Sequence, residues 1–330
     1  MSYITATCGG HRGSIPSPSR PGFSTLKYGG NTSAYHVQAG PFSFLLDMGS
    51  GLSVLGDKFM REGKGFNGQH IVLISHWHWD HIQGGPFFVP FFIASNTFHY
   101  HGFAPAGHEG KHGLEHAVEN LLEHHQSSPH FPVAHGSMPC GKIYPKAHQR
   151  QFSESFWYYL DENDKLVMCP DAYIGLTRET LPASLKMDPK RWVRVTTIPL
   201  NHPDGCLGYR IDYMGESFVY ATDDEPLMFL NKELVKHGQG ADIGIFDGQY
   251  TVEQLAGMCQ TFGHGTPRRC VEHAKACGMK RCIIGHFDPK HDDAKLDAML
   301  ADAQAYALEI GYTGIVEFAV EGTMWNLGEG

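Results

Sequence analysis

The sequence predicts an α/β protein in which two sheets lie between layers of helices. Three observations support this prediction. The first fifty residues alternate short strand-like runs with turns rich in Gly, Pro and Ser, which is typical of hairpins. The remainder alternates strand-like and helix-like segments. Several apolar runs also lead directly into His or Asp, and strand ends are where an α/β scaffold usually places its chemistry.

The N-terminal elements are short strands separated by turns. Residues 1–7 have no basic region and no long apolar stretch, so they are predicted to form a first strand and not a signal peptide. Turn-rich loops are predicted at 9–21 and 29–33, and strands at 34–37 and 42–46.

The middle of the chain contains a buried strand, an aromatic stretch and an insertion. The strand is the apolar run 71–74. For the aromatic residues at 86–92 we favour a place in the core over a wall for substrate. The insertion, at about 105–135, has apolar residues at helical spacing and predicts an amphipathic helix that could cover the active site or form a dimer contact. Its other face is interpreted as solvated, in preference to a second metal site. That face carries His112, His116, His124 and His125.

The second half of the chain repeats strands and helices. No internal repeat or low-complexity linker interrupts it, so no domain boundary is placed. The predicted strands lie within 151–173, 191–199, 208–213, 217–220, 241–247 and 313–320, and the predicted helices at 267–278 and 292–310.

Composition restricts the choice of partners. Lys and Arg number 26 and Asp and Glu 35, for a formal charge of -9. This charge argues against broad binding to long nucleic acids, which depends on basic surface. A small anionic substrate remains compatible, because two bound divalent ions would reverse the local charge. Eight cysteines without a C-x-x-C pair predict free thiols in a reducing compartment. No run is long enough to cross a membrane, so we predict a soluble cytoplasmic protein.

The segment at 75–81, SHWHWDH, places four potential metal ligands within six residues. Side chains alternate along an extended segment, so His76 and His78 leave on the same side. Asp80 and His81 follow where the chain turns, and they can face a different point. One segment can therefore supply two ligands to each of two neighbouring metals. Imidazole and carboxylate suit zinc, manganese or iron.

This motif resembles the signature of the metallo-β-lactamase superfamily, and further segments match in order. Those segments carry Asp47, His202, Asp223 and His286. Two pieces at 12–16 and 28–33 narrow the resemblance to a phosphodiesterase-type branch, related to ribonuclease Z and to cyclic-nucleotide phosphodiesterases. The resemblance implies a single αββα sandwich domain over residues 1–330, with the helical insertion at about 105–135.

The resemblance also implies a role for each candidate ligand. One metal would be held by His76, His78 and His202, the second by Asp80, His81 and His286, with Asp223 bridging the two. A hydroxide held between two cations is a strong nucleophile, because the cations lower the pKa of bound water. Asp80 would also orient that hydroxide. Two divalent ions are expected, with zinc as the default and manganese or iron also suited.

His264 separates the branches of the superfamily. Ribonuclease Z and its relatives have a His-Ser-Thr segment here, whose His contacts phosphate and helps to protonate the leaving oxygen. This chain has Gly265 in place of Ser, although Thr266 and the start of a helix could still receive a phosphate. The alternative is that His264 caps that helix or lies on the surface. Tyr250, shortly before it, is either an active-site wall or ordinary core.

Other residues near the motifs have open interpretations. Asp47 either hydrogen-bonds a ligand histidine and fixes its tautomer, or caps backbone amides in its turn. Trp77 and Trp79 are expected to pack around the metals, with stacking on a nucleobase as the weaker alternative. Asp292 is expected to start the last helix, and Asp288 is left open.

These features predict a dinuclear metal-dependent hydrolase. A phosphodiesterase that cleaves a small phosphodiester, such as a cyclic nucleotide, by attack of metal-bound hydroxide is favoured because His264 accompanies the full ligand set. The alternative is a lactonase, lactamase or thioesterase, which has no need of His264. A tRNA-processing nuclease is disfavoured, because it would need a basic surface or an RNA-binding arm and this chain is acidic overall. A redox di-iron enzyme is disfavoured, because it usually has a carboxylate in place of one early His and His78 is retained here. A non-enzymatic binder is disfavoured, because it would have lost metal ligands and none is lost here. A homodimer is common among relatives and is left open.

Overall fold

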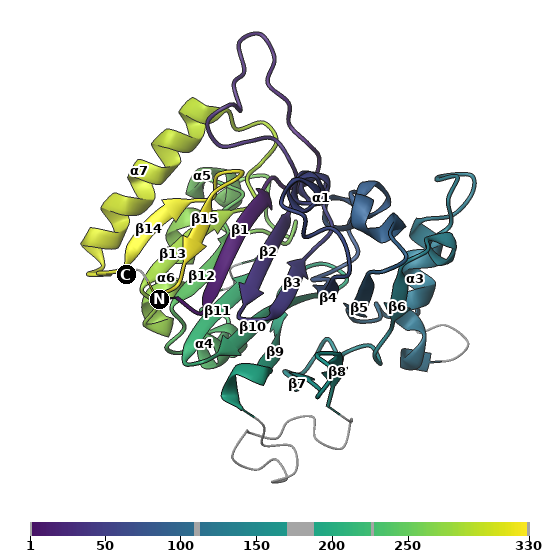
Figure 1. Ribbon diagram of the computed structural model, residues 1–330. Helices are drawn as coiled ribbons and strands as arrows, with labels where there is room; N and C mark the ends of the chain where they lie inside the picture. The colour runs from purple at the N-terminus through teal and green to yellow at the C-terminus, as the bar shows by residue number, and fades with distance from the viewer. Residues whose placement is uncertain (1, 109–112, 170–187, 226–227, 329–330) are drawn as a thin grey trace.

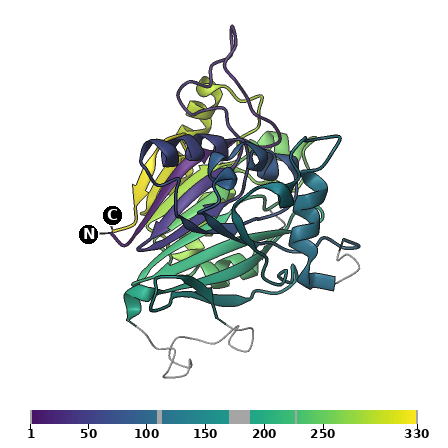
Figure 2. The same ribbon diagram turned by 45° about the vertical axis from the view of Figure 1, so that its right-hand side comes forward.

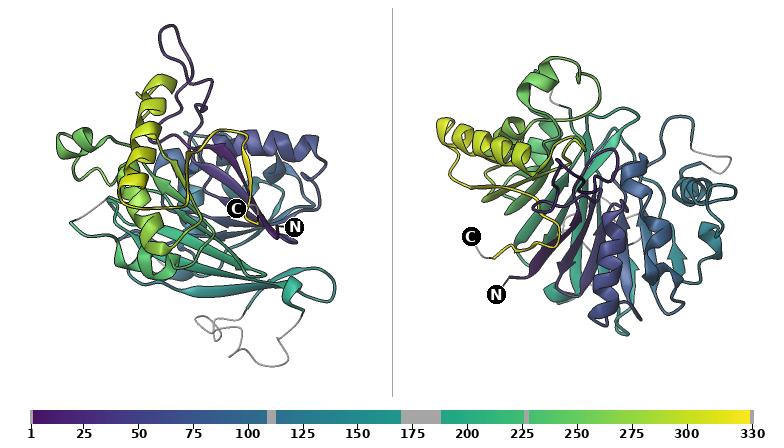
Figure 3. Two further views of the ribbon diagram at one scale, coloured as in Figure 1. Left: turned by 90° about the vertical axis from the view of Figure 1, so that its left-hand side faces the viewer. Right: turned by 90° about the horizontal axis from the view of Figure 1, so that it is seen from above.

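The computed structural model describes residues 2–108, 113–169, 188–225 and 228–328 as two mixed sheets that face each other between helices (Figures 1 and 3). The first sheet has seven strands in the order β15-β1-β2-β3-β4-β5-β6, and the second has eight in the order β14-β13-β12-β11-β10-β9-β7-β8. Each sheet joins an antiparallel part to a parallel part. The predicted α/β sandwich is confirmed.

The strands of the first sheet are β1 (Ile4–Gly10), β2 (Ala34–Ala39), β3 (Phe42–Leu46), β4 (Gln69–Leu73), β5 (Thr97–His101), β6 (Gly141–Ile143) and β15 (Met324–Asn326). Those of the second are β7 (Ser155–Leu160), β8 (Leu166–Met168), β9 (Trp192–Leu200), β10 (Cys206–Tyr213), β11 (Glu216–Ala221), β12 (Ile243–Asp247), β13 (Arg281–Gly285) and β14 (Ile315–Phe318). The helices are α1 (Gly51–Arg61), α2 (Trp79–Ile82), α3 (Ala117–His125), α4 (Lys232–Gly238), α5 (Val252–Ala256), α6 (Pro267–Cys277) and α7 (Asp293–Glu309).

Both faces of the central strands are buried, which explains their continuous apolar runs. In β3, Phe44 and Leu46 point into the core between the sheets, whereas Leu45 packs against the outer helices. Ile245 and Phe246 of β12 divide in the same way. Successive strand residues face opposite sides, so a strand covered on both sides needs apolar residues throughout. The shared core between the sheets supports a single domain, which stays a prediction.

Helices cover the outer face of each sheet. α1 and α3 pack on the first sheet, and α3 lies beside its β5–β6 edge (Figures 1 and 2). α4, α6 and α7 pack on the second sheet. Gly278 directly follows α6 and takes the left-handed conformation, with φ 68°, which glycine adopts at a helix end without steric strain.

Most predicted elements are present, with differences at their ends. The aromatic stretch at 86–92 divides, because Phe88 and Phe91 are buried while Phe87 and Phe92 are exposed, so the core prediction is right only in part. Asp292 is the N-cap of α7 and accepts from the Lys295 amide, as predicted. The helices α1, α2, α4 and α5 were not predicted. His112 and the end of the 151–173 segment lie outside the described residues.

All eight cysteines are free thiols, as predicted. Among the described residues, none of the helices has the length and apolar character needed to span a bilayer.

Candidate metal centre

Seven ligand-type side chains lie beyond the carboxyl ends of strands from both sheets. After β4 come His76, His78, Asp80 and His81, and after β9, β11 and β13 come His202, Asp223 and His286. β3 and β4 run parallel, and β9, β11 and β13 share one direction in the second sheet. The loops that leave these strands therefore meet at one edge, which is where open α/β sheets bind ligands.

Three residues at these strand ends have left-handed backbone. The φ angle is 59° at Asp47, 59° at Asp223 and 56° at His286. Side chains disfavour this region, and such conformations concentrate at functional sites. The repetition at three strand ends agrees with side-chain positions that are fixed by function.

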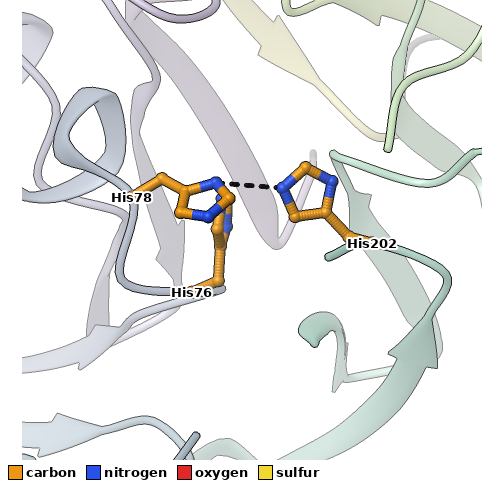
Figure 4. A group of neighbouring side chains, drawn as sticks. All are labelled: His76, His78 and His202. Atoms are coloured by element: carbon orange, nitrogen blue, oxygen red, sulfur yellow. Dashed lines mark hydrogen bonds between the residues drawn. The ribbon is translucent and has the colours of Figure 1, made fainter. Parts of the chain in front are cut away.

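The first ligand group consists of His76, His78 and His202 (Figure 4). His78 Nδ1 and His202 Nε2 lie 3.0 Å apart, and each residue has a ligand atom within 4.8 Å of the others. Nitrogens that share a tetrahedral zinc ion lie roughly 3.3 Å apart, given a Zn–N distance of about 2.0 Å. His202 Nδ1 donates to the Gly263 carbonyl at 2.7 Å, so its Nε2 has a lone pair toward the group.

The second ligand group consists of Asp80, His81 and His286. The Nε2 atoms of His81 and His286 lie 3.0 Å apart, and Asp80 Oδ2 lies 3.2 Å from His286 Nε2. The backbone amide of Ser14 donates to the same Asp80 oxygen at 2.7 Å. This carboxylate is therefore fixed from outside the SHWHWDH segment.

Asp223 lies between the two groups. Its Oδ2 is 3.5 Å from His76 Nε2 and 3.4 Å from His81 Nε2, and its Oδ1 is 3.3 Å from His286 Nε2. One carboxylate thus contacts imidazoles of both groups, which is the arrangement that a bridging ligand needs.

The donor set fits divalent metal ions. Burial lowers the pKa of His76 well below its usual value and lowers that of His202 to about 4, so both rings are held in the neutral form that binds metals. His76 Nε2 is buried and has no hydrogen-bond partner among the described residues. An unpaired buried polar atom costs about 1–3 kcal/mol, and a metal bond would remove that cost. Imidazole and carboxylate together suit zinc, manganese or iron.

Asp47 performs both of the actions that the sequence left open. Its Oδ1 accepts from the Ser75 amide at 2.7 Å, so it caps backbone at the end of β4. Its Oδ2 accepts from His81 Nδ1 and from Tyr220 Oη, each at 2.7 Å. Asp47 therefore holds His81 with Nε2 toward the second group.

Replacement of Asp47 tests this positioning contact. We expect Asp47→Ala to weaken metal affinity about 10- to 100-fold, because His81 loses the partner that fixes its tautomer. Tyr220→Phe is the matched control, since it removes one hydrogen bond to Asp47 and leaves the contact between Asp47 and His81. Competition against a zinc chelator measures both variants. Equal affinity in Asp47→Ala and the unmodified protein would contradict the positioning role.

His264 lies beside both ligand groups and is buried. Its Nδ1 is 3.0 Å from Asp247 Oδ2 and 3.8 Å from Asp223 Oδ2, and its ring stacks on His286 with centroids 4.9 Å apart. Burial acts to lower the pKa of His264, but the Asp247 and Asp223 carboxylates outweigh burial and raise it. The interpretations of His264 as a helix cap or a surface residue are wrong, because Thr266 is the N-cap of α6.

The structure explains why glycine follows His264. A Cβ atom on Gly265 would lie 2.6 Å from the Asp247 carbonyl oxygen, which is closer than real side chains approach. Serine is therefore excluded by this backbone. Tyr250 is a wall for the histidine, since it is buried and its ring lies 5.8 Å from the His264 ring at 76°.

Two contacts of the centre were missed in the sequence. Asp247 holds His264, and the signal was available because the apolar run before it ends in Asp, as β3 does before Asp47. Gly13 was also missed: a Cβ there would lie 2.6 Å from His286 Cε1, so only glycine allows the loop after β1 to reach Asp80 through Ser14.

Comparison with known proteins agrees with this geometry. No protein-family model matches the chain. Ribonuclease Z of Brevibacillus brevis is 23% identical over 289 residues, which are 83% of this chain and 84% of that protein. The metallo-β-lactamase fold protein YhfI from Bacillus subtilis superposes with a TM-score of 0.61 and 19% identity, over 98% of this chain and 99% of that one. The chain therefore has the metallo-β-lactamase fold.

A second structure supports the same fold. The short form of human tRNase Z has a TM-score of 0.57 and 17% identity, with coverage of 98% of this chain and 99% of that one. The structural matches establish the fold, and the sequence match is to a ribonuclease Z. The resemblance recognised in the sequence is therefore confirmed.

Two expectations about neighbouring aromatic residues need correction. Trp79 does not pack around the centre, because 79% of it is exposed. Trp77 packs with both the core between the sheets and the core under α1 and α3, and its Nε1 donates to the Phe103 carbonyl at 2.7 Å. The two indoles therefore lie in different environments, although both residues adjoin ligand candidates in the chain.

The histidines of the insertion lie apart from the centre. His116 and His124 are exposed, in agreement with a solvated helix face. Within the described residues, no group of three or more potential metal ligands includes His116, His124 or His125. Asp288 accepts from the Lys290 amide at 2.7 Å and so shapes the turn before α7.

Proposed function

We propose that this protein is a metal-dependent hydrolase that cleaves a small phosphodiester, such as a cyclic nucleotide. The observation that carries the proposal is the position of His264. Its ring is held by Asp247 at 3.0 Å and lies 3.8 Å from Asp223, the carboxylate between the two ligand groups. A proton donor at this place suits cleavage of a P–O bond, whose leaving oxygen needs a proton.

The two ligand groups would hold one divalent ion each, as assigned from the sequence. Such ions supply an activated water and positive charge beside the phosphoryl oxygens. The Ser14 amide keeps Asp80 Oδ2 in place, so that carboxylate can orient the attacking water. His264 Nδ1 is occupied by Asp247, which leaves Nε2 as the ring atom available to the leaving oxygen.

A small substrate is preferred to a long nucleic acid. The formal charge of -9 opposes the non-specific phosphate contacts on which binding of long nucleic acids depends. Positive charge would come mainly from the bound ions, which suits one phosphodiester group. The eight free thiols support a reducing compartment such as the cytoplasm.

A substrate panel tests the proposal. Metal-loaded protein is assayed with bis(p-nitrophenyl) phosphate, 3′,5′-cyclic nucleotides, a precursor tRNA, a β-lactam and a lactone. We expect cleavage of the small diesters, loss of that activity with a chelator, and its return on addition of zinc or manganese. Lactam or lactone cleavage without diester cleavage would overturn the proposal in favour of a carbonyl hydrolase. Cleavage of precursor tRNA alone would overturn the small-substrate part.

A further inference from the structure

The candidate centre opens to solvent on one side, at His78. The other six ligand candidates are at most 8% exposed, whereas His78 is half-buried. Trp79 follows His78 directly and is 79% exposed. Consecutive Cα atoms are 3.8 Å apart, so the indole starts next to the open side of the centre.

Two other exposed apolar side chains adjoin residues that touch the ligands. Ile15 is 60% exposed and follows Ser14, whose amide binds Asp80. Phe262 is 54% exposed and precedes Gly263, whose carbonyl binds His202. Trp79, Ile15 and Phe262 are each one peptide bond from a group that is itself a ligand candidate or is hydrogen-bonded to one.

Within the described part of the chain, no hydrogen bond or ring contact accounts for the position of the Trp79 indole. Among the described residues it forms no aromatic pair, and its Nε1 donates no hydrogen bond to protein. Scattered exposed apolar residues are ordinary, but Trp79 lies in the chain between two ligand candidates and directly follows the most exposed of them. An exposed indole is a stacking platform for any flat aromatic group.

We infer that Trp79 is a specificity-determining residue that stacks on a flat aromatic group of the substrate, while the phosphodiester lies at the centre. This inference rests on the proposed function and deepens it. Nucleobases and simple aryl groups share the required chemistry. The substrate class is therefore a phosphodiester with an aromatic substituent that stays on the non-leaving side, where the stacking contact persists during cleavage.

Substrates with one leaving group and different retained groups test the inference. All three release p-nitrophenolate: bis(p-nitrophenyl) phosphate retains an aryl group, thymidine 5′-(p-nitrophenyl) phosphate a nucleobase, and methyl p-nitrophenyl phosphate neither. We expect Trp79→Ala to raise KM about tenfold for an aromatic substrate and less than about twofold for the methyl ester. Trp79→Phe should restore most of the difference, because phenylalanine also stacks. A larger effect on the thymidine ester than on the aryl ester would assign the platform to nucleobases, and the reverse order to aryl groups.

Leu308→Ala is the matched control. Leu308 is 81% exposed and lies near the end of α7. This helix connects the parallel strands β13 and β14, so its end lies at the edge of the second sheet opposite to the edge where His286 lies. This variant should leave KM unchanged for all three substrates. An equal rise in KM for the aromatic and methyl esters in Trp79→Ala, or no rise at all, would overturn the inference.

Binding without turnover separates this inference from the proposed function. Diphenyl phosphate and dimethyl phosphate are titrated calorimetrically into metal-loaded protein. We expect diphenyl phosphate to bind about tenfold more weakly to Trp79→Ala than to the unmodified protein, with dimethyl phosphate unaffected. If that difference appears although no diester is cleaved, the proposed function fails and the stacking role stands. If diesters are cleaved but the difference is absent, the stacking role fails and the proposed function stands.

Discussion

Asp80→Asn is expected to lower kcat for phosphodiester cleavage by about 10³-fold or more. The substitution keeps the size of the side chain and an oxygen that can accept from the Ser14 amide at the present 2.7 Å. It removes the negative charge that lies 3.2 Å from His286 Nε2 and 3.4 Å from His81 Nε2. The second ligand group would therefore lose its only charged member and its means of orienting the attacking water.

Two measurements accompany this variant. Bound metal per protein, measured by atomic emission, should fall below that of the unmodified protein, and far-UV circular dichroism should be unchanged. Asp57→Asn, on the exposed face of α1, is the control and should retain full activity and metal. Full activity with full metal content in Asp80→Asn would contradict the proposed mechanism.

His264→Ala is expected to reduce kcat by about 10²- to 10⁴-fold on a substrate with a poor leaving group, such as a 3′,5′-cyclic nucleotide. A sugar alkoxide needs a proton as it departs, and His264 is the buried ring beside Asp223 that can provide it. The loss should be smaller for bis(p-nitrophenyl) phosphate, because p-nitrophenolate leaves readily without a proton. Metal content is measured in parallel, because His264 also forms a group of potential metal ligands with Asp223, Asp247 and His286. Unchanged content is expected for a proton donor, and reduced content would indicate that His264 binds metal.

Asp247→Asn distinguishes a proton-transfer role from a steric one. Asp247 Oδ2 accepts from His264 Nδ1 at 3.0 Å and from the Gly265 amide at 3.1 Å. An asparagine keeps the shape but not the charge, so we expect a smaller loss in kcat with the same dependence on leaving group. A loss in His264→Ala that is equal for both leaving groups would indicate that His264 only shapes the site.

Several features of the centre were readable from local sequence pattern. Each ligand candidate follows an apolar run within a few residues, and a run of that kind forms a buried strand whichever strands become its neighbours. The alternation along 75–81 predicted that His76 and His78 would share one group, and the structure brings them together with His202. Asp292 as a helix start was equally local, because an N-cap depends on residues within one turn.

Local pattern failed where a side chain had two compatible environments. Trp79 lies between two ligand candidates, yet it is exposed, whereas Trp77, two residues earlier, packs into two cores. Both are large apolar residues in the same short segment. The difference accompanies a change in the backbone, because α2 begins at Trp79 whereas Trp77 lies before that helix.

The sequence by itself determined the α/β class and the free thiols, and it supplied seven candidate metal ligands that the structure brings into neighbouring groups. Only the tertiary structure decided which residues hold the site side chains in place: Ser14 holds Asp80, Asp47 holds His81, and Asp247 holds His264. Those pairs are separated by 66, 34 and 17 residues in the chain. Their contact depends on the order of strands within two sheets and on how the sheets face each other, and neither is encoded in local periodicity.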